Sequence, residues 1–206
     1  DAAIPNWPAK FDVGDVELTL RAVRNMDADL HAGVTTARCL GDRSFVDVHC
    51  RQAVASGSLP GPSLVVATRG IRATHGHGLI GYPFDGVDTV RRVVRENIRA
   101  GADFIKTSTG KESVNATLPY SLVMTRAIRE YHELTGHRVG YKPAGGIGKA
   151  KDALNYLVLM KEELGRPWLE PELFRFGASS LLGDIERQLE HHVSGRYSAL
   201  HRHPSG

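Results

Sequence analysis

Five short apolar runs, each rich in β-branched residues and bounded by glycine, proline or aspartate, recur along the chain. Such runs predict strands, and their lack of polar alternation is typical of strands buried on both faces of a parallel sheet. They begin about 30 to 40 residues apart, which is the length of one βα unit. We therefore expect strands at Val34–Leu40, Ser63–Thr68, Asp103–Thr107, Val139–Lys142 and Phe174–Ala178.

Between these runs, apolar residues recur with the period of an α-helix. Pro119 stands near one helix start, and Gly101, Gly136 and Gly165 stand where helices should end. The pattern predicts helices at Val13–His31, Val46–Ala55, Val87–Ala100, Leu118–Leu134, Lys149–Leu164 and Ser180–Val193.

The alternation predicts an α/β protein of about five parallel βα units. A closed (β/α)₈ barrel needs eight strands and usually about 250 residues, whereas this chain has 206. We expect either an open doubly wound, flavodoxin-like sheet or an incomplete barrel. Strands at the exposed edges of such a sheet favour a homo-oligomer, because pairing with a second copy covers them.

Composition narrows the class of protein. With 41% hydrophobic and 24% charged residues, the chain can bury a core as one domain over residues 1–206, and it is neither disordered nor collagen-like. No apolar run approaches the roughly 20 residues of a membrane helix, and a net charge of +3 spread along the chain argues little for nucleic acid. Cys39 and Cys50 fit reduced thiols of a cytoplasmic protein.

The two halves of the chain use different charged residues. Residues 1–102 hold one Lys and eleven Arg, with nine Asp and two Glu, whereas residues 103–206 hold six Lys and eight Arg, with three Asp and nine Glu. Both ratios change at one place, which suggests two sources joined inside one fold. We expect segments at 1–102 and 103–200, followed by a disordered tail at 201–206.

Two lysines stand at the ends of consecutive predicted strands, Lys106 and Lys142. An ammonium group inside an apolar strand costs free energy, so its pKa falls, and a second cation beside it lowers the pKa further. The freed lone pair can attack a carbonyl group. The alternative is that both side chains extend to solvent at the end of the sheet.

Small and hydroxyl residues follow three predicted strands just before a helix. Free backbone N–H groups at helix starts, with hydroxyls beside them, suit phosphate. Ordinary capping chemistry is the alternative explanation. The residues are Thr109, Gly110, Gly145, Gly146, Ser179 and Ser180.

The runs Phe104–Lys111, Lys142–Gly146 and Phe176–Ser180 together resemble the last three strands of the 2-deoxyribose-5-phosphate aldolase family, whose members are Schiff-base-forming (β/α)₈ barrels. The resemblance covers about residues 103–200. It implies that Lys106 is the Schiff-base lysine, tuned by Lys142, in a lyase that reversibly adds acetaldehyde to glyceraldehyde 3-phosphate without a cofactor. By the same resemblance the phosphate, or inorganic phosphate or sulfate in its place, is bound by Gly110, Lys111, Gly145, Gly146, Ser179 and Ser180 with Thr109 beside them.

The chain also departs from that family. Gly148 and Lys149 follow Ile147 where the family commonly has an arginine. Earlier family strands supply an aspartate that assists proton transfer, and residues 1–102 do not resemble them. We therefore expect at most weak aldol or retro-aldol turnover.

The first segment resembles the metal-dependent amidohydrolases, which are also (β/α)₈ barrels, through the runs Leu30–Arg38, Gly61–Ala67 and Thr74–Gly78. His75 and His77 could form a metal-ligand pair, but two histidines flanked by glycines are more typical of a loop. The family's other ligands are missing, so we expect no metal site.

These resemblances predict an engineered or recombined chimera of two barrel fragments. One hypothesis gives it an aldolase-like Schiff-base site. The other treats it as a scaffold whose site residues are inherited without activity. Metal-dependent hydrolysis is a third hypothesis, below both, because the ligand set is broken.

Overall fold

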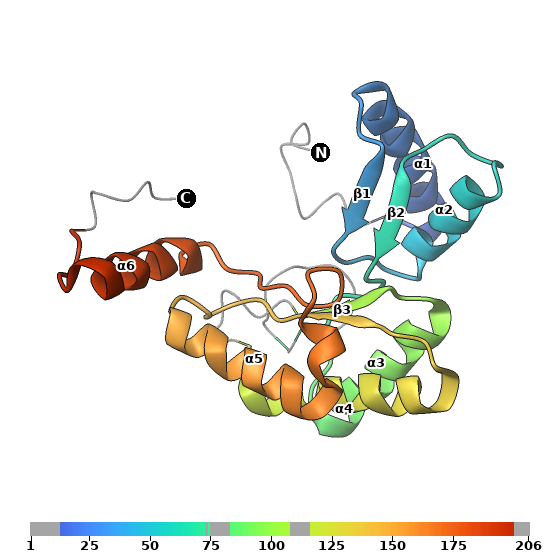
Figure 1. Ribbon diagram of the computed structural model, residues 1–206. Helices are drawn as coiled ribbons and strands as arrows, with labels where there is room; N and C mark the ends of the chain where they lie inside the picture. The colour runs from blue at the N-terminus through green and yellow to red at the C-terminus, as the bar shows by residue number, and fades with distance from the viewer. Residues whose placement is uncertain (1–12, 73, 75–82, 108–115, 200–206) are drawn as a thin grey trace.

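The computed structural model describes residues 13–72, 74, 83–107 and 116–199. Helices and strands alternate through them, and the strands pair in parallel, so the chain has the expected α/β fold (Figure 1). The elements are α1 (Asp15–His31), β1 (Thr36–Cys39), α2 (Val46–Ala55), β2 (Ser63–Val66), α3 (Val87–Ala100), β3 (Phe104–Lys106), α4 (Leu118–Thr135), β4 (Gly140–Lys142), α5 (Ala150–Leu164), the 3₁₀ turn η2 (Arg166–Leu169) and α6 (Leu181–Ser194).

The described strands follow one another in the order of the sequence. β1 pairs with β2 and β3 pairs with β4, and the N–H of Asp103 joins the two pairs by donating to the carbonyl of Val66 (2.9 Å). A doubly wound sheet reverses its strand order at a switch point, whereas a barrel wall does not. The described strands show no such reversal, and the choice between an open sheet and an incomplete barrel stays a prediction.

The strand expected at Phe174–Ala178 is not formed as a continuous strand, which corrects the prediction. Phe174 and Gly177 instead make single parallel bridges to Tyr141 and Ala144. Lys142 and Pro143 lie between these two bridges on the neighbouring segment, and Pro143 has no N–H to donate, so the ladder is interrupted there. The segment still runs beside β4 as the fifth member of the sheet.

One face of β3 and β4 packs on helices. Figure 1 shows α3, α4 and α5 together on that side of the strands, and Ile105 and Tyr141 are buried there. The Tyr141 hydroxyl donates to Ser121 of α4 (2.7 Å). Side chains alternate along a strand, so Lys106 and Lys142 point to the opposite side, which we call the inner face.

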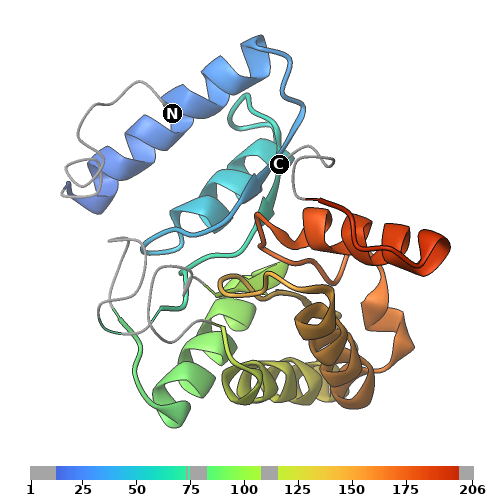
Figure 2. The same cartoon turned by 90° about the vertical axis from the view of Figure 1, so that its left-hand side faces the viewer.

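The apolar core consists of two clusters, which correspond to two groups of helices. Figure 2 shows the blue and cyan helices α1 and α2 grouped apart from the green to brown helices α3, α4 and α5. The first cluster is built from residues up to Val66, and the second begins at Ile71 and includes Ala102. The expected division after Ala102 stays a prediction, and the expected tail at 201–206 lies outside the described residues.

Two findings concern the expected reduced thiols and the expected absence of a membrane helix. Cys39 and Cys50 are both free thiols. None of the described helices is long and apolar enough to cross a membrane. The cytoplasmic location and the pairing of sheet edges between copies stay predictions.

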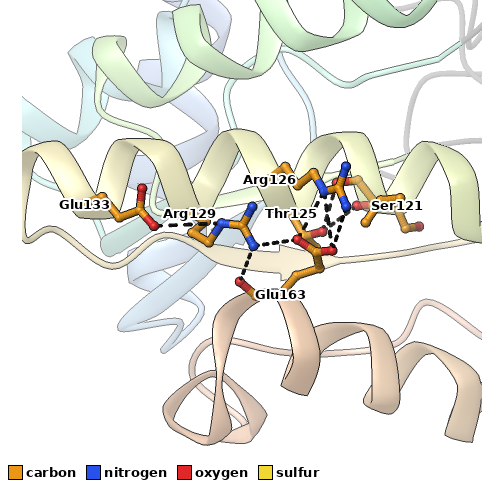
Figure 3. Close-up of polar contacts among 7 residues, drawn as sticks. Ser121, Thr125, Arg126, Arg129, Glu133 and Glu163 are labelled. Atoms are coloured by element: carbon orange, nitrogen blue, oxygen red, sulfur yellow. Dashed lines mark hydrogen bonds and ion pairs between the residues drawn. The ribbon is translucent and has the colours of Figure 1, made fainter.

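A polar cluster clamps α4 against α5 (Figure 3). Glu163 near the end of α5 accepts from Arg129 (2.7 Å) and from Arg126 (3.2 Å), and Arg129 also reaches Glu133 on its own helix (3.9 Å). The Glu163 side chain is only 13% exposed, so these bonds are less screened than ordinary surface ion pairs.

We expect Glu163→Gln to lower the free energy of unfolding by about 1 kcal/mol, because the charge-assisted bonds become neutral ones. Urea denaturation measures the change. Glu162→Gln is the matched control, since Glu162 lies on the same helical turn and is exposed. If both substitutions lowered the free energy of unfolding equally, the ion pairs of Glu163 would not stabilise the packing of α4 against α5.

Two carboxylates lie where β1 and β2 end. Asp42 accepts from the N–H of Asp47 (2.5 Å), and Asp47 accepts from the N–H of Thr68 (2.9 Å). Burial, and then the charge of Asp42, raise the pKa of Asp47 to about 6.

The raised pKa predicts a pH-dependent stability. The unfolded chain releases this proton near pH 4, and the folded chain keeps it to about pH 6, so the free energy of unfolding falls across that window by on the order of 3 kcal/mol. Asp47→Asn is expected to flatten the slope of stability against pH, measured by urea denaturation from pH 4.5 to 7.5. Asp88→Asn, at the second position of α3 and with its side chain 97% exposed, should leave the slope unchanged. An unchanged slope in Asp47→Asn would refute the assignment.

Candidate functional site

The two lysines singled out in the sequence lie side by side. β3 and β4 pair in the register Phe104 with Gly140, Ile105 with Tyr141 and Lys106 with Lys142. Both lysines are therefore the last residues of neighbouring strands, whose backbones are about 4.8 Å apart. The register also places both on the inner face, so their stems leave the sheet in the same direction.

The surroundings favour the neutral amine of Lys106. Burial lowers its pKa, and the charge of Lys142 lowers it further. The pKa of Lys142 is lowered too, by burial and then by the charges of Arg38 and Arg175. A lysine amine with a depressed pKa is a nucleophile near neutral pH.

Sequence reasoning missed the two arginines of this face. The N–H of Arg175 donates to the carbonyl of Tyr141 (3.3 Å), which sets Arg175 beside Lys142 on the next segment. The guanidinium of Arg38, on β1, lies over the Phe104 ring with Cζ 4.7 Å from its centroid. The only sequence signal was an arginine inside each strand-like run, at a position that no motif marks.

Gly177 lets the fifth segment pass close to Ala144. A Cβ at residue 177 would lie 2.6 Å from Cβ of Ala144 and 3.6 Å from Cε of Lys142. The N–H of Gly177 donates to the carbonyl of Pro143 (2.9 Å), which holds the fifth segment at this short separation. A glycine is therefore required where this segment passes Ala144.

The expected phosphate loops lie next to each other at the ends of β4 and the fifth segment. Gly145 and Gly146 both have positive φ angles (104° and 75°), a conformation that favours glycine. A Cβ on Gly148 would lie 3.1 Å from Oγ of Ser180, so the two loops are in contact. Ser179 and Ser180 are exposed.

An acidic side chain also lies at the start of α5, next to these two loops. Asp184 of α6 accepts from the N–H of Ala150 at the start of α5 (2.7 Å). The N–H of Ala150 therefore already has a hydrogen-bond acceptor, and the negative charge of Asp184 disfavours the binding of an anion at the start of α5. Lys149 is exposed beside it.

Several predicted residues lie outside the described part of the chain, namely Thr109, Gly110, Lys111, His75 and His77. Within the described residues, no group of three or more His, Cys, Asp or Glu side chains could hold a metal ion.

A small cavity of about 50 Å³ lies on the helix side of β3, lined by Thr107, Tyr120, Ser121 and Met124 among others. Neither Lys106 nor Lys142 lines it. Thr107 alternates with Lys106 along the chain, so the cavity is on the opposite side of the sheet from the lysine pair.

Comparison with known proteins gives a family match and close relatives. The model of the DeoC/LacD family aldolase matches residues 71–184. The human deoxyribose-phosphate aldolase is 66% identical over 105 residues, which are 51% of this chain and 33% of the human protein. The bovine deoxyribose-phosphate aldolase has the same values. The chain thus spans about a third of the length of these relatives.

Solved structures show two likenesses. An amidohydrolase is 27% identical with a TM-score of 0.56, covering 75% of this chain and 42% of that protein. A protein from Toxoplasma gondii ME49, titled as a candidate deoxyribose-phosphate aldolase, is 22% identical with a TM-score of 0.57, covering 86% of this chain and 67% of that one. The latter likeness shows the fold alone.

The close approach at Gly177 yields a stability prediction. Gly177→Ala is expected to lower the free energy of unfolding by about 1–3 kcal/mol, because the new methyl group overlaps Ala144. Ala144→Gly in the same chain should restore part of the loss by removing the opposing methyl group. Urea denaturation of the single and double variants measures both effects.

Gly183→Ala is the control, since a Cβ there meets nothing within 4 Å and the residue lies in α6. It should be neutral or stabilising by up to about 1 kcal/mol. If Gly177→Ala behaved in the same way, the fifth segment would not pack on Ala144 as described.

Proposed function

Because the chain belongs to the DeoC/LacD family of aldolases, we propose that Lys106 is a nucleophile that forms a Schiff base with a carbonyl substrate. The observation that carries the proposal is the register pairing of Lys106 with Lys142 on the inner face. Burial and this neighbouring cation lower the pKa of Lys106, so the neutral amine is present at a pH where most lysines are charged.

A neutral lysine amine can react with a carbonyl compound through an imine and an enamine. The Nζ lone pair adds to the carbonyl carbon, and the carbonyl oxygen leaves as water with both amine hydrogens. Protonation of the imine makes it an electron sink, so loss of a proton from the adjacent carbon gives an enamine. The enamine carbon then bonds to the aldehyde carbon of a second substrate, and hydrolysis of the product imine returns Lys106.

We propose acetaldehyde as the donor and glyceraldehyde 3-phosphate as the acceptor, in a reversible lyase reaction. The names of the human and bovine relatives support a phosphorylated substrate. The paired glycine loop and Ser180, which meet at the ends of neighbouring segments, support a phosphate site there. We assign the phosphate to Thr109, Gly110, Lys111, Gly145, Gly146, Ser179 and Ser180.

Turnover in this chain should be weak. The family match begins at residue 71, so it leaves out the earlier strands that in the family supply a proton-transferring aspartate. Asp103, the carboxylate next to β3, is already bound to Arg51 (2.7 Å) and to the N–H of Val66 (2.8 Å). Imine formation needs less assistance than carbon–carbon bond formation, so we expect adducts to form faster than products.

We also propose that the chain combines fragments of two barrel families. The family match begins at residue 71 and the two apolar clusters divide between Val66 and Ile71, so the boundary that these observations support lies near residues 66–71 instead of after Ala102. The structural likeness to an amidohydrolase, at 27% identity over 75% of the chain, is compatible with a second barrel family as a source.

Borohydride trapping tests the Schiff base. Acetaldehyde followed by sodium borohydride is expected to leave one ethyl adduct on Lys106, read by intact mass and peptide mapping. Lys106→Leu should abolish the adduct, and Lys161→Leu, at an exposed lysine of α5, should retain it. No adduct, or labels scattered over surface lysines, would mean that the chain is a scaffold with an inherited motif.

The pH dependence of trapping tests the role of Lys142. Removal of its charge in Lys142→Met raises the pKa of Lys106, so the labelling profile should move to higher pH. At pH 7 the rate should fall roughly ten-fold for each unit of that rise. If the profile did not move, the charge of Lys142 would have no part in the mechanism, and burial would be the only cause of the lowered pKa of Lys106.

A further inference from the structure

The small cavity on the helix side of β3 lies on the opposite side of the sheet from the lysine pair. Its volume is about 50 Å³, and its lining comes from the end of β3, from α3 and α4, and from the segment that follows β2. One water needs about 10–15 Å³ of such space, so the cavity holds more than a single water. It is therefore large enough for a small ligand, and it is separate from the proposed Schiff-base site.

Buried apolar side chains form much of the wall of this cavity. Ile71, Val90 and Met124 line it, and each is 3% exposed. All three belong to the larger apolar cluster, and Phe84 packs against that cluster and lines the cavity as well. Side chains around an empty space lose dispersion contacts on that side, and an apolar occupant restores these contacts. The wall therefore favours a ligand with an apolar part.

Ser121 also lines the cavity, but its hydroxyl hydrogen is already used. Ser121 accepts from the Tyr141 hydroxyl (2.7 Å) and is hydrogen-bonded to the Tyr156 hydroxyl. Tyr156 in turn donates to the carbonyl of Ala116. Because Tyr156 gives its own hydrogen to Ala116, the hydrogen between Ser121 and Tyr156 belongs to Ser121. Ser121 therefore has no hydrogen left to donate to a ligand.

Thr107 offers the cavity a hydrogen-bond donor. Its Oγ1 accepts from the N–H of Ala144 (3.0 Å) and its backbone N–H donates to the carbonyl of Lys142 (3.4 Å), so the side chain is held in place. Thr107 lines the cavity and is 3% exposed. Among the described residues, no group accepts the hydrogen of its hydroxyl. A buried donor without an acceptor costs free energy, and an oxygen atom of a ligand in the cavity would remove that cost.

We propose that this cavity binds a neutral molecule of about three heavy atoms that carries one hydrogen-bond acceptor. The acceptor lies on the Thr107 hydroxyl, and the apolar part of the molecule packs on Ile71, Val90 and Met124. A cavity of about 150 Å³ holds benzene with its six carbons, so a cavity of about 50 Å³ suits a molecule of roughly half that size or less.

The charges of the lining set a second limit on the ligand. One cation and one anion line the cavity, Arg72 and Asp85, so it favours neither an anionic nor a cationic ligand. Removing an ionised group from water is costly unless an opposite charge pairs with it, so the occupant is neutral. Short ethers, ketones and aldehydes meet these limits. Acetaldehyde belongs to this class, and on this side of the sheet it would bind without a covalent step.

Dimethyl ether and propane provide the test, because they share a three-atom skeleton and differ in the acceptor oxygen. The chain has three methionines, of which Met124 lines the cavity and Met26 and Met160 do not. With ¹³C-labelled methionine methyl groups, an NMR titration is expected to move the Met124 resonance saturably and to leave the other two in place. So few heavy atoms limit the affinity to roughly the millimolar range.

The ether is expected to bind about five-fold more tightly than propane, which is the effect of one hydrogen bond. If the Met124 resonance showed no saturable shift with either probe, the cavity would bind no such ligand. Equal affinities for the two probes would overturn the selection of an acceptor by Thr107.

Thr107→Val keeps the shape of the side chain and removes the donor, so the affinity for the ether should fall about five-fold while that for propane stays unchanged. Thr125→Val is the matched control and should retain the preference for the ether. Thr125 is also buried, its hydroxyl donates to the carbonyl of Ser121 (2.9 Å), and it does not line the cavity. A preference that survives Thr107→Val would refute the role of Thr107.

Val90→Ile tests the location without changing any hydroxyl, because the added methyl group fills part of the cavity. It should weaken the binding of both probes, whereas Val87→Ile, at a residue of the same helix that is 48% exposed, should weaken neither. Unchanged binding in Val90→Ile would place the probes elsewhere and overturn the site. Because neither probe contains a carbonyl group, these results are independent of Lys106 and of the borohydride trapping that tests the proposed function.

Discussion

The structure depends on one residue that joins its two pairs of strands. The Asp103 carboxylate accepts from the N–H of Val66 and from Arg51 of α2, while its own N–H donates to the Val66 carbonyl. Its carbonyl accepts from the N–H of Gly140 (2.9 Å) at the start of β4. A single position thus connects β2, β3, β4 and α2, and through them the two apolar clusters. An acidic residue is needed because the same oxygen receives a backbone and a guanidinium donor.

That junction fixes the register on which the chemistry rests. With Asp103 bound to Gly140, the next residues pair as Phe104 with Gly140 and, two positions later, Lys106 with Lys142. A shift of one residue would exchange the faces, placing Ile105 on the inner side and a lysine against α4. The buried bond from Tyr141 to Ser121 opposes such a shift. The register thus buries Lys106 and places Lys142 beside it, the two causes that lower the pKa of Lys106.

Much of this arrangement could be predicted from the sequence. The helices at Val46–Ala55 and Val87–Ala100 have the expected bounds, because their amphipathic period is clear and glycines punctuate the chain. The lysine pair followed from two consecutive parallel strands. The interrupted fifth strand could not be predicted, since the cause is a proline on its neighbour. Arg38 and Arg175 were missed because side-chain direction depends on register, which no local motif reports.

The charge of the inner face explains why the junction and the site belong together. Arg38, Lys142 and Arg175 repel one another, and burial together with this repulsion lowers the pKa of Lys142 and of Arg38. Asp103 offsets part of the effect, since its charge raises the pKa of Arg38 against burial and Arg175. The residue that joins the strand pairs therefore also attracts the guanidinium of Arg38, which lies over Phe104. Burial and then Lys142 lower the pKa of Lys106, so the charges around the amine come from residues on both sides of the junction.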